Sequence, residues 1–481
     1  MLEALAHNQL KQLLRGKKNS WPHNLTLSRL VARSLRRKDA TSIQLGNGCD
    51  ENWWIGLLLP LSISSSNVVL ILSKKQRLRL LQVELPFLQS EGISLPIWEG
   101  QVPPSDNQVW ILDHLGFLNA FKSGHLNSRQ LIIPDSALLS EKLREVMAIK
   151  ITSSDWDKLR RCHPVAESAI ISEYEKLTKN LFSKAISKDE KISLPWPEII
   201  ALRQLINLLK PAPSPWSDLI ELNDNLWVGW AELHHKTFNW TWQIMPLEPY
   251  VNLNKLFANI PTIFLSKGIK NELFKNQLGY SKCSLDVDVT LGGSIIEESI
   301  SLFAPSMQPL PNSEIFSKHL LDQSLRLILG CEGLTVVLLD DSLLLQKLTT
   351  QLASEFGKRV IYESKTPEIN GVLCCSWKWW LQFQDQLPVP EQLIIALLPI
   401  PSISSPLMSA RVEALKKDGH DWFRDLLLPE AVRMIPPAIS SIRKKQGRVA
   451  ILDGRLRSRS WGETILKIME PWTSLNRLLP K

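Results

Sequence analysis

Leu-Leu-Pro-Ile-Pro at 397–401 begins the stretch that decides the fold, and it continues with Ser-Pro-Leu-Met-Ser-Ala-Arg-Val-Glu-Ala-Leu at 405–415. The apolar run at 393–397 predicts a buried strand, and residues 407–417 predict a helix. The same alternation precedes this stretch, with a helix expected at 342–356 and strands at 334–339, 359–361 and 372–375. Strands that alternate with helices favour a parallel α/β sheet.

The N-terminal part of the chain alternates in the same way. We expect helices at 1–20, 24–35 and 53–61, and strands at 42–50, 67–73, 108–112, 130–133 and 261–266. Residues 53–73 carry no charge, but Pro60 and the polar run at 62–67 divide them into two short pieces. A buried helix followed by a buried strand therefore explains them better than a membrane span, which needs about 20 apolar residues.

The pattern changes between residues 151 and 250. Helices are expected at 167–186 and 196–209, and a β-hairpin over 226–242 suits the alternation of Trp227, Trp230, Trp240 and Trp242. We therefore predict a first α/β domain at 1–150 and 251–284, a helical, Trp-rich insert at 151–250, and a second α/β domain at 285–481.

The 481-residue chain has a formal net charge of +8, with 44% hydrophobic and 22% charged residues. This composition is typical of a folded protein, and the basic excess favours polyanions such as nucleic acid, although it also fits an ordinary basic protein. The positive charge is concentrated in runs at 17–18, 33–38, 74–79 and 443–459. The candidate nucleic-acid contacts in these runs are Lys74, Lys75, Arg77, Arg443, Lys444, Lys445 and Arg448.

The six cysteines are scattered and form no Cys-x-x-Cys pair. Such usage argues against a disulfide framework, a zinc site and an iron–sulphur site, and it fits a reducing cytoplasm. The N-terminus lacks the charged and then apolar pattern of a signal peptide. We expect a cytoplasmic protein that holds no metal and has no membrane partner.

The order and spacing of the C-terminal motifs resemble the second motor domain of DinG/XPD-like superfamily-two DNA helicases. These motifs lie at 397–401, 405–415, 419–423, 428–432 and 449–456. The resemblance covers residues 1–150 and 255–481. It implies two RecA-like parallel-sheet motor domains with an insert in the first, ATP and magnesium as cofactors, and DNA as the partner.

The stretch that resembles the family's phosphate loop has lost its lysine. The loop corresponds to Gly46-Asn47-Gly48-Cys49-Asp50-Glu51-Asn52, where Gly46 and Gly48 keep the spacing and Glu51 or Trp53 replaces the lysine. The candidate cofactor-binding residues are Gly46, Gly48, Glu51 and Asn52. Asp50 and Glu51 would repel a triphosphate, so a tight turn that binds nothing is the alternative interpretation.

The resemblance also places substitutions at the catalytic motifs. At 131–139, Pro134 replaces the metal-binding Asp and Asp135 the catalytic Glu, so Asp135 is the degenerate catalytic counterpart or a helix N-cap. At 437–444, Ser440 and Ser441 replace the Gly-Arg of the arginine finger, and Lys444 is the sole cation near an arginine position. The family's four iron–sulphur cysteines have no counterpart, because Cys49 is the single cysteine between Gly48 and Asp113.

Three functions remain open from the sequence. The leading hypothesis is a helicase-related protein that binds DNA, probably single-stranded and with low specificity, or a protein partner, without hydrolysing ATP. The first alternative is an active ATP-dependent DNA helicase in which Lys267 or Lys444 supplies a compensating cation at the 46–52 turn. The second is a non-catalytic scaffold whose Trp-rich 215–245 region docks a protein.

Overall fold

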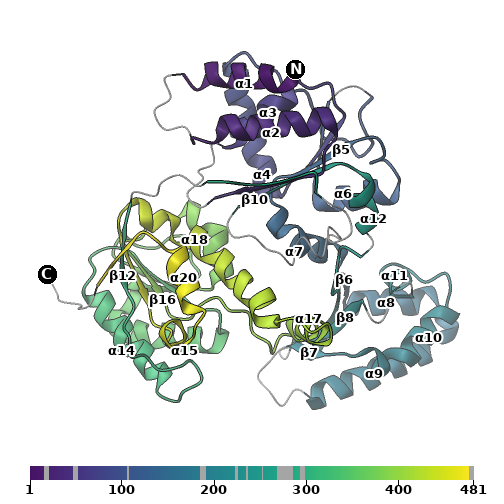
Figure 1. Cartoon of the computed structure of the whole chain (residues 1–481). Coiled ribbons are helices and arrows are strands. Elements are labelled where there is room, and N and C mark those ends of the chain that lie inside the picture. The colour runs from purple at the N-terminus through teal and green to yellow at the C-terminus, as the bar shows by residue number, and fades with distance from the viewer. Residues whose placement is uncertain are drawn as a thin grey trace.

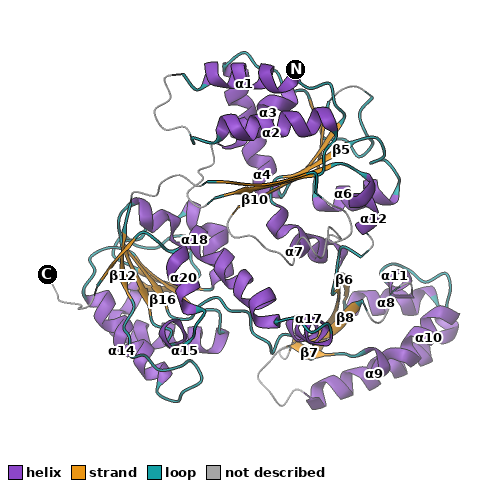
Figure 2. Cartoon of the chain, in the orientation of Figure 1, coloured by secondary structure: helices purple, strands orange, loops and turns teal. Residues whose placement is uncertain are grey.

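The protein consists of two seven-stranded sheets and a smaller four-stranded sheet, each covered by helices (Figures 1 and 2). The computed structural model describes residues 1–15, 21–46, 53–105, 108–184, 191–220, 222, 226–234, 237–251, 253–267, 285–292 and 298–475. In Figure 1 the first sheet lies at the top, the second at the lower left and the small sheet at the lower right. The predicted α/β class with two parallel-sheet domains is therefore confirmed.

The first sheet is parallel, with strand order β11-β1-β10-β5-β2-β4-β3. Its strands are β1 (Thr41–Leu45), β2 (Val68–Ile71), β3 (Ile97–Trp98), β4 (Val109–Leu112), β5 (Gln130–Ile133), β10 (Thr262–Lys267) and β11 (Val287–Leu291). The domain boundary predicted at residue 285 needs correction, because β11 pairs with β1 at the edge of this first sheet. Sequence periodicity identifies a strand but not its partner.

Helices cover both faces of the first sheet. One face packs against α1 (Leu2–Leu13), α2 (Asn24–Arg37), α3 (Trp53–Ile63), η1 (Leu80–Glu84) and α5 (Leu85–Ser90). The other face packs against α6 (His114–Lys122), α7 (Ser136–Met147) and α12 (Asn254–Asn259). Residues 53–61 of α3 are all buried, which explains their lack of charge and confirms the predicted buried helix. Among the described residues, no helix is both long and apolar enough to cross a membrane.

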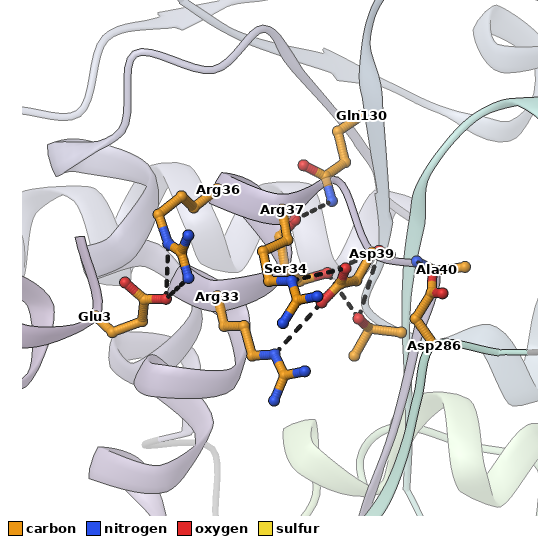
Figure 3. Close-up of polar contacts among 10 residues, drawn as sticks. Glu3, Arg33, Ser34, Arg36, Arg37, Asp39, Ala40, Gln130 and Asp286 are labelled. Carbon is orange, nitrogen blue, oxygen red and sulfur yellow. Dashed lines mark hydrogen bonds and ion pairs between the residues drawn. The ribbon is translucent and has the colours of Figure 1, made fainter. Parts of the chain in front are cut away.

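Polar contacts fix the start of β1 (Figure 3). The guanidinium of Arg36 donates to Glu3 on α1 at 2.7 and 2.9 Å, and Arg33 lies 3.4 Å from the Asp39 carboxylate. The backbone N–H of Ala40 donates to Asp286, just before β11, at 2.7 Å. Much of the basic run at 33–38 therefore joins α1 and α2 to the strands that they cover.

The second sheet is also parallel, with strand order β14-β15-β13-β16-β17-β12-β18. Its strands are β12 (Ile300–Phe303), β13 (Thr335–Leu338), β14 (Val360–Tyr362), β15 (Val372–Cys375), β16 (Gln392–Ile395), β17 (Arg448–Ile451) and β18 (Trp472–Ser474). One face packs against α14 (Phe316–Leu329) and α15 (Ser342–Phe356). The other packs against α16 (Trp377–Phe383), α18 (Leu428–Lys444), α19 (Arg455–Ser458) and α20 (Gly462–Ile468).

The small sheet is antiparallel and forms between β5 and β10 of the first sheet in chain order. Its strands, in the order β6-β9-β8-β7, are β6 (Ile149–Ile151), β9 (Asn239–Pro246), β8 (Trp227–His234) and β7 (Lys191–Ser193). It packs with α8 (Ser153–Cys162), α9 (Glu167–Lys184), α10 (Ile200–Leu208) and α11 (Trp216–Ile220). The hairpin predicted at 226–242 is β8 and β9.

Candidate functional site

The carboxyl end of β1 leads into the turn that the sequence singles out. The N–H of Gly46 donates to the carbonyl of Leu291 at 2.9 Å, which continues the pairing of β1 with β11. Gly48, Glu51 and Asn52 lie outside the described residues, so their assignment to a phosphate loop stays a prediction.

Lys267 lies beside both ends of this turn. It is the last residue of β10, is exposed, and pairs in register with Leu45. Its ammonium lies 5.5 Å from the ring centroid of Trp53, the first residue described after the turn. The structure thus brings one of the two cations named from the sequence to the position where a compensating charge would be needed.

The end of β5 supplies a different set of groups from a magnesium–triphosphate site. Pro134 is buried, and Asp135 occupies the N-cap position of α7 without making a side-chain capping bond. The hydroxyl of the next residue, Ser136, donates to the carbonyl of Leu265 on β10 at 2.9 Å. A magnesium–nucleotide site relies on carboxylates at this edge of the sheet. The described residues here therefore fit magnesium and ATP poorly.

The end of β4 begins a helix instead of a catalytic loop. The carboxylate of Asp113 caps α6 by accepting the N–H of Gly116 at 2.7 Å. Burial, together with the nearby Lys142 ammonium, lowers the pKa of His114 below its ordinary value. The His114 imidazole is therefore neutral near pH 7, in keeping with the structural role expected for it.

Three of the basic candidates follow the carboxyl end of β2. Lys74, Lys75 and Arg77 all belong to α4 (Lys74–Arg79), which begins three residues after the strand. Lys75 reaches the second domain, where its ammonium lies 2.6 Å from Asp385 in η5 (Gln384–Gln386). Arg77 pairs with Glu99 at 2.6 Å, and this bond raises the pKa of its guanidinium. Lys74 and Lys75 thus carry the positive charge that the described structure leaves most accessible at this edge.

Arg443 does not have the surface position expected of a nucleic-acid contact. Its side chain is 9% exposed, and its guanidinium donates to the carbonyls of Glu298, Met469 and Pro471 at 2.6–3.0 Å. Burial lowers the pKa of Arg443. The guanidinium instead joins the end of α18 to the segments before β12 and β18.

Lys444, Lys445 and Arg448 lie where α18 ends and β17 begins. The ammonium of Lys445 is 2.7 Å from Glu391, and Arg448 donates to Gln392 at 3.2 Å. The sequence had suggested a strand-to-helix junction for this basic run, and that expectation is wrong because α18 precedes the strand. The run therefore lies at the amino edge of the second sheet, whereas α4 lies at the carboxyl edge of the first.

The outer stripe of α18 carries the substituted arginine-finger positions. Pro437, Ser440 and Lys444 are exposed, and the hydroxyl of Ser440 donates to the carbonyl of Pro437 within the helix. Arg433, one turn earlier, reaches the first domain, where it lies 3.2 Å from Glu141 of α7. Sequence reasoning missed Arg433, although its helical spacing from Pro437 places it on the same stripe.

The tryptophans of the insert are mostly inside the protein. Trp216, Trp230, Trp240 and Trp242 are all buried, so they offer no exposed hot spot and the scaffold alternative loses its basis. Trp380 of α16 is also buried, and its indole N–H donates to the carbonyl of Ala438 at 3.0 Å.

The described cysteines do not form a metal site. Burial raises the pKa of Cys374 to about 11, and Cys375 lies beside it on β15. Within the part of the chain that the structure describes, no group of three or more His, Cys, Asp or Glu side chains is arranged to hold a metal ion. Cys49 and Cys283 lie outside that part.

Comparison with known proteins gives local sequence matches and a full-length structural match. No protein-family model matches the chain. The ATP-dependent DNA helicase YoaA of Haemophilus influenzae is 31% identical over 137 residues, which are 28% of this chain and 21% of that protein. The ATP-dependent DNA helicase DinG of Photobacterium profundum is 28% identical over 97 residues, 19% of this chain and 14% of that protein. The matches thus span about a fifth or less of these curated relatives.

Solved structures extend the likeness to nearly the whole chain. S. tokodaii Xpd4 superposes with a TM-score of 0.61 at 14% identity, over 94% of this chain and 99% of that one. An apo structure of XPD gives a TM-score of 0.58 at 12% identity, over 94% of this chain and 100% of that one. The chain is therefore related to the DinG/XPD-like superfamily-two helicases and has their RecA-like two-domain fold.

Proposed function

We propose that the protein is a helicase-related nucleic-acid-binding protein that does not hydrolyse ATP. The observation that carries the proposal is the pair of substituted edges in the two motor domains. Buried Pro134 ends the strand where the resemblance requires a metal-binding carboxylate, and Ser440 bonds within its own helix where it requires the arginine finger.

The chemistry of phosphoryl transfer gives these substitutions their weight. The reaction is accelerated by positioning the triphosphate and by placing positive charge where negative charge develops, with little covalent participation by the protein. Proline and serine contribute neither the magnesium ligand nor the guanidinium. Loss of an arginine finger alone typically costs about 10³–10⁵ in rate.

DNA, probably single-stranded and bound with low sequence specificity, is the partner that we propose. Lys74 and Lys75 place two ammonium groups at the carboxyl edge of the first sheet, and the chain as a whole is basic. Contacts of this kind neutralise phosphates without reading bases. We further propose that the protein works in the cytoplasm, where the thiols of Cys162, Cys331, Cys374 and Cys375 stay reduced as they are in the structure.

Calorimetric titration of the purified protein with magnesium–ATP, with and without single-stranded DNA, tests the catalytic half of the proposal. We expect no heat of nucleotide binding in either titration, and DNA binding that weakens with salt. Micromolar nucleotide binding together with DNA-stimulated phosphate release would refute it.

Lys267 favours a second candidate function, an active ATP-dependent DNA helicase. Its position next to Leu45 and Trp53 is where a cation could face a phosphate held by the 46–52 turn. If this candidate is right, Lys267→Ala abolishes nucleotide binding while Lys444→Ala does not. If our leading proposal is right, neither substitution changes an already absent signal.

A further inference from the structure

A group of six charged side chains lies where the two motor domains and the insert meet. Glu141 and Arg144 belong to α7 of the first domain, and Glu248 follows β9 of the insert. Arg411 lies on α17 (Pro406–Lys417), and Glu430 and Arg433 lie on α18, all in the second domain. We call these six residues the junction network. Figure 1 shows α7 and α17 between the three sheets.

The centre of the junction network is buried. Arg144 and Arg411 are 5% and 9% exposed, and Arg411 lies 2.8 Å from Glu430. The Nε of Arg144 donates to the carbonyl of Leu247 at 3.3 Å. The network therefore excludes most of the water that would otherwise screen its charges.

Charges from different domains act on one another in this network. Burial and the nearby Arg411 lower the pKa of Arg144 to about 10, whereas Glu248 and Glu430 oppose that shift. Burial raises the pKa of Glu248, while Arg144 and Arg411 lower it. Arginines from the first and second domains thus share one carboxylate from the insert. At the rim, Arg433 and Glu141 form an ion pair between α18 and α7.

Apolar packing joins the same domains next to the network. α17 packs against β7 and β8 of the small sheet (Figure 1). Trp230 of β8 is 5% exposed, although strand alternation directs it away from the core that contains Ala231 and Leu233. We attribute its burial to α17, which lies on that outer face.

We propose that the junction network and the α17 contact form an autoinhibitory lock that holds the two motor domains and the insert as one body. Moving the second domain away would separate Arg411 from Glu248 and Arg433 from Glu141. It would also uncover Trp230. Breaking buried charge pairs leaves uncompensated charges, which opposes such opening strongly. The lock is independent of the proposed lack of ATP hydrolysis, because a chain without hydrolysis could still move its domains.

Distances between spin labels test the lock directly. Leu5→Cys on α1 and Leu329→Cys on α14 place labels on exposed sites of the two motor domains, and Leu208→Cys labels the insert. The parent chain for labelling carries serine in place of Cys49, Cys162, Cys283 and Cys331. We expect one narrow distance distribution for each label pair, unchanged by single-stranded DNA or by a non-hydrolysable ATP analogue. A second distance that appears with either ligand overturns the proposal.

Charge exchange identifies the contacts responsible. Arg433 and Glu141 are both partly exposed, so Arg433→Glu should fold, and we expect it to broaden the distribution between motor domains at least twofold. Combining Arg433→Glu with Glu141→Arg should restore the narrow distribution. Arg424→Glu is the matched control, since Arg424 pairs with Asp421 inside the second domain and should leave the distances unchanged.

A more disruptive variant covers the case in which the rim pair contributes little. Arg411→Glu combined with Arg433→Glu removes both arginines that the second domain brings to the network, and circular dichroism verifies that the chain still folds. We expect a broad distribution between the motor domains. A narrow distribution in this folded double variant overturns the proposal.

Discussion

Residues 74–79 and 443–448 each hold four Lys or Arg in six positions, yet the structure uses the two runs differently. The first lies on α4 at the carboxyl edge of its sheet, with Lys74 and Lys75 exposed. The second ends a helix at the amino edge of its sheet, and Arg443 is bonded to three carbonyls inside the domain. Charge density in a sequence therefore does not reveal whether a charge is available to a ligand.

The largest effect should come from Arg443. Arg443→Met leaves three backbone carbonyls without their donor, and we expect a loss of about 3 kcal/mol in the free energy of unfolding, measured by urea denaturation. The neighbouring exposed residue is the control, and Lys444→Ala should change stability by less than about 0.5 kcal/mol. If Arg443→Met weakened DNA binding while stability stayed unchanged, the contrast between the two runs would be wrong.

The next effect concerns DNA affinity at α4. Replacing Lys74 and Lys75 together by alanine should weaken binding of single-stranded DNA roughly tenfold at low salt and reduce the salt slope by about 1.4, if two phosphate contacts are lost.

Fluorescence anisotropy over a range of salt concentrations measures both quantities for α4. The charge-matched control replaces Lys318 on α14 and Lys347 on α15 by alanine. Equal losses in the two double variants would mean that net charge, not the edge of the sheet, attracts the DNA.

A smaller effect should appear in the pH dependence of stability. The folded state holds the pKa of His114 below its ordinary value of 6.5, so the folded chain binds fewer protons than the unfolded chain near pH 6. Stability should thus be complete above about pH 6.5 and decrease as the pH falls below it.

Melting temperatures at pH 7.5 and pH 5.5 test this dependence. We expect His114→Gln to melt less differently at the two pH values than the parent. His125→Gln, in the turn after α6, controls for the loss of a histidine elsewhere. An unchanged difference in His114→Gln would show that other groups cause the dependence.

The smallest effect should come from Lys445. Its ion pair with Glu391 is about half exposed on both sides, and such pairs contribute about 0–1 kcal/mol. Lys445→Ala should therefore leave both the urea midpoint and the DNA affinity nearly unchanged. A loss of affinity equal to that of Lys75→Ala would place DNA at both edges.

Local sequence patterns were sufficient for most elements but not for their partners. The predicted strand at 372–375 and helix at 342–356 coincide with β15 and α15, because apolar runs and helical periodicity report local burial. The membership of β11 in the first sheet could not be predicted, since strand pairing is a long-range property. The same holds for the edge at which Arg443–Lys445 lies.

The candidate site was predicted unevenly for a similar reason. Lys267 was named from its chemistry, and the pairing of β10 with β1 brings it to the turn. Arg433 was missed because its significance depends on Glu141, almost 300 residues earlier in the chain. The assignments of Gly48, Glu51 and Asn52 remain predictions.

The central position of β1 has a consequence for protein synthesis. β1 pairs with β10 on one side and β11 on the other, and both follow the insert in the chain. A nascent chain must therefore translate roughly 200 further residues, about 10–40 s at common elongation rates, before either neighbour of β1 leaves the ribosome. Throughout that interval α3 and β1 expose apolar surface, so we expect chaperone binding to concentrate on nascent chains that end before residue 291.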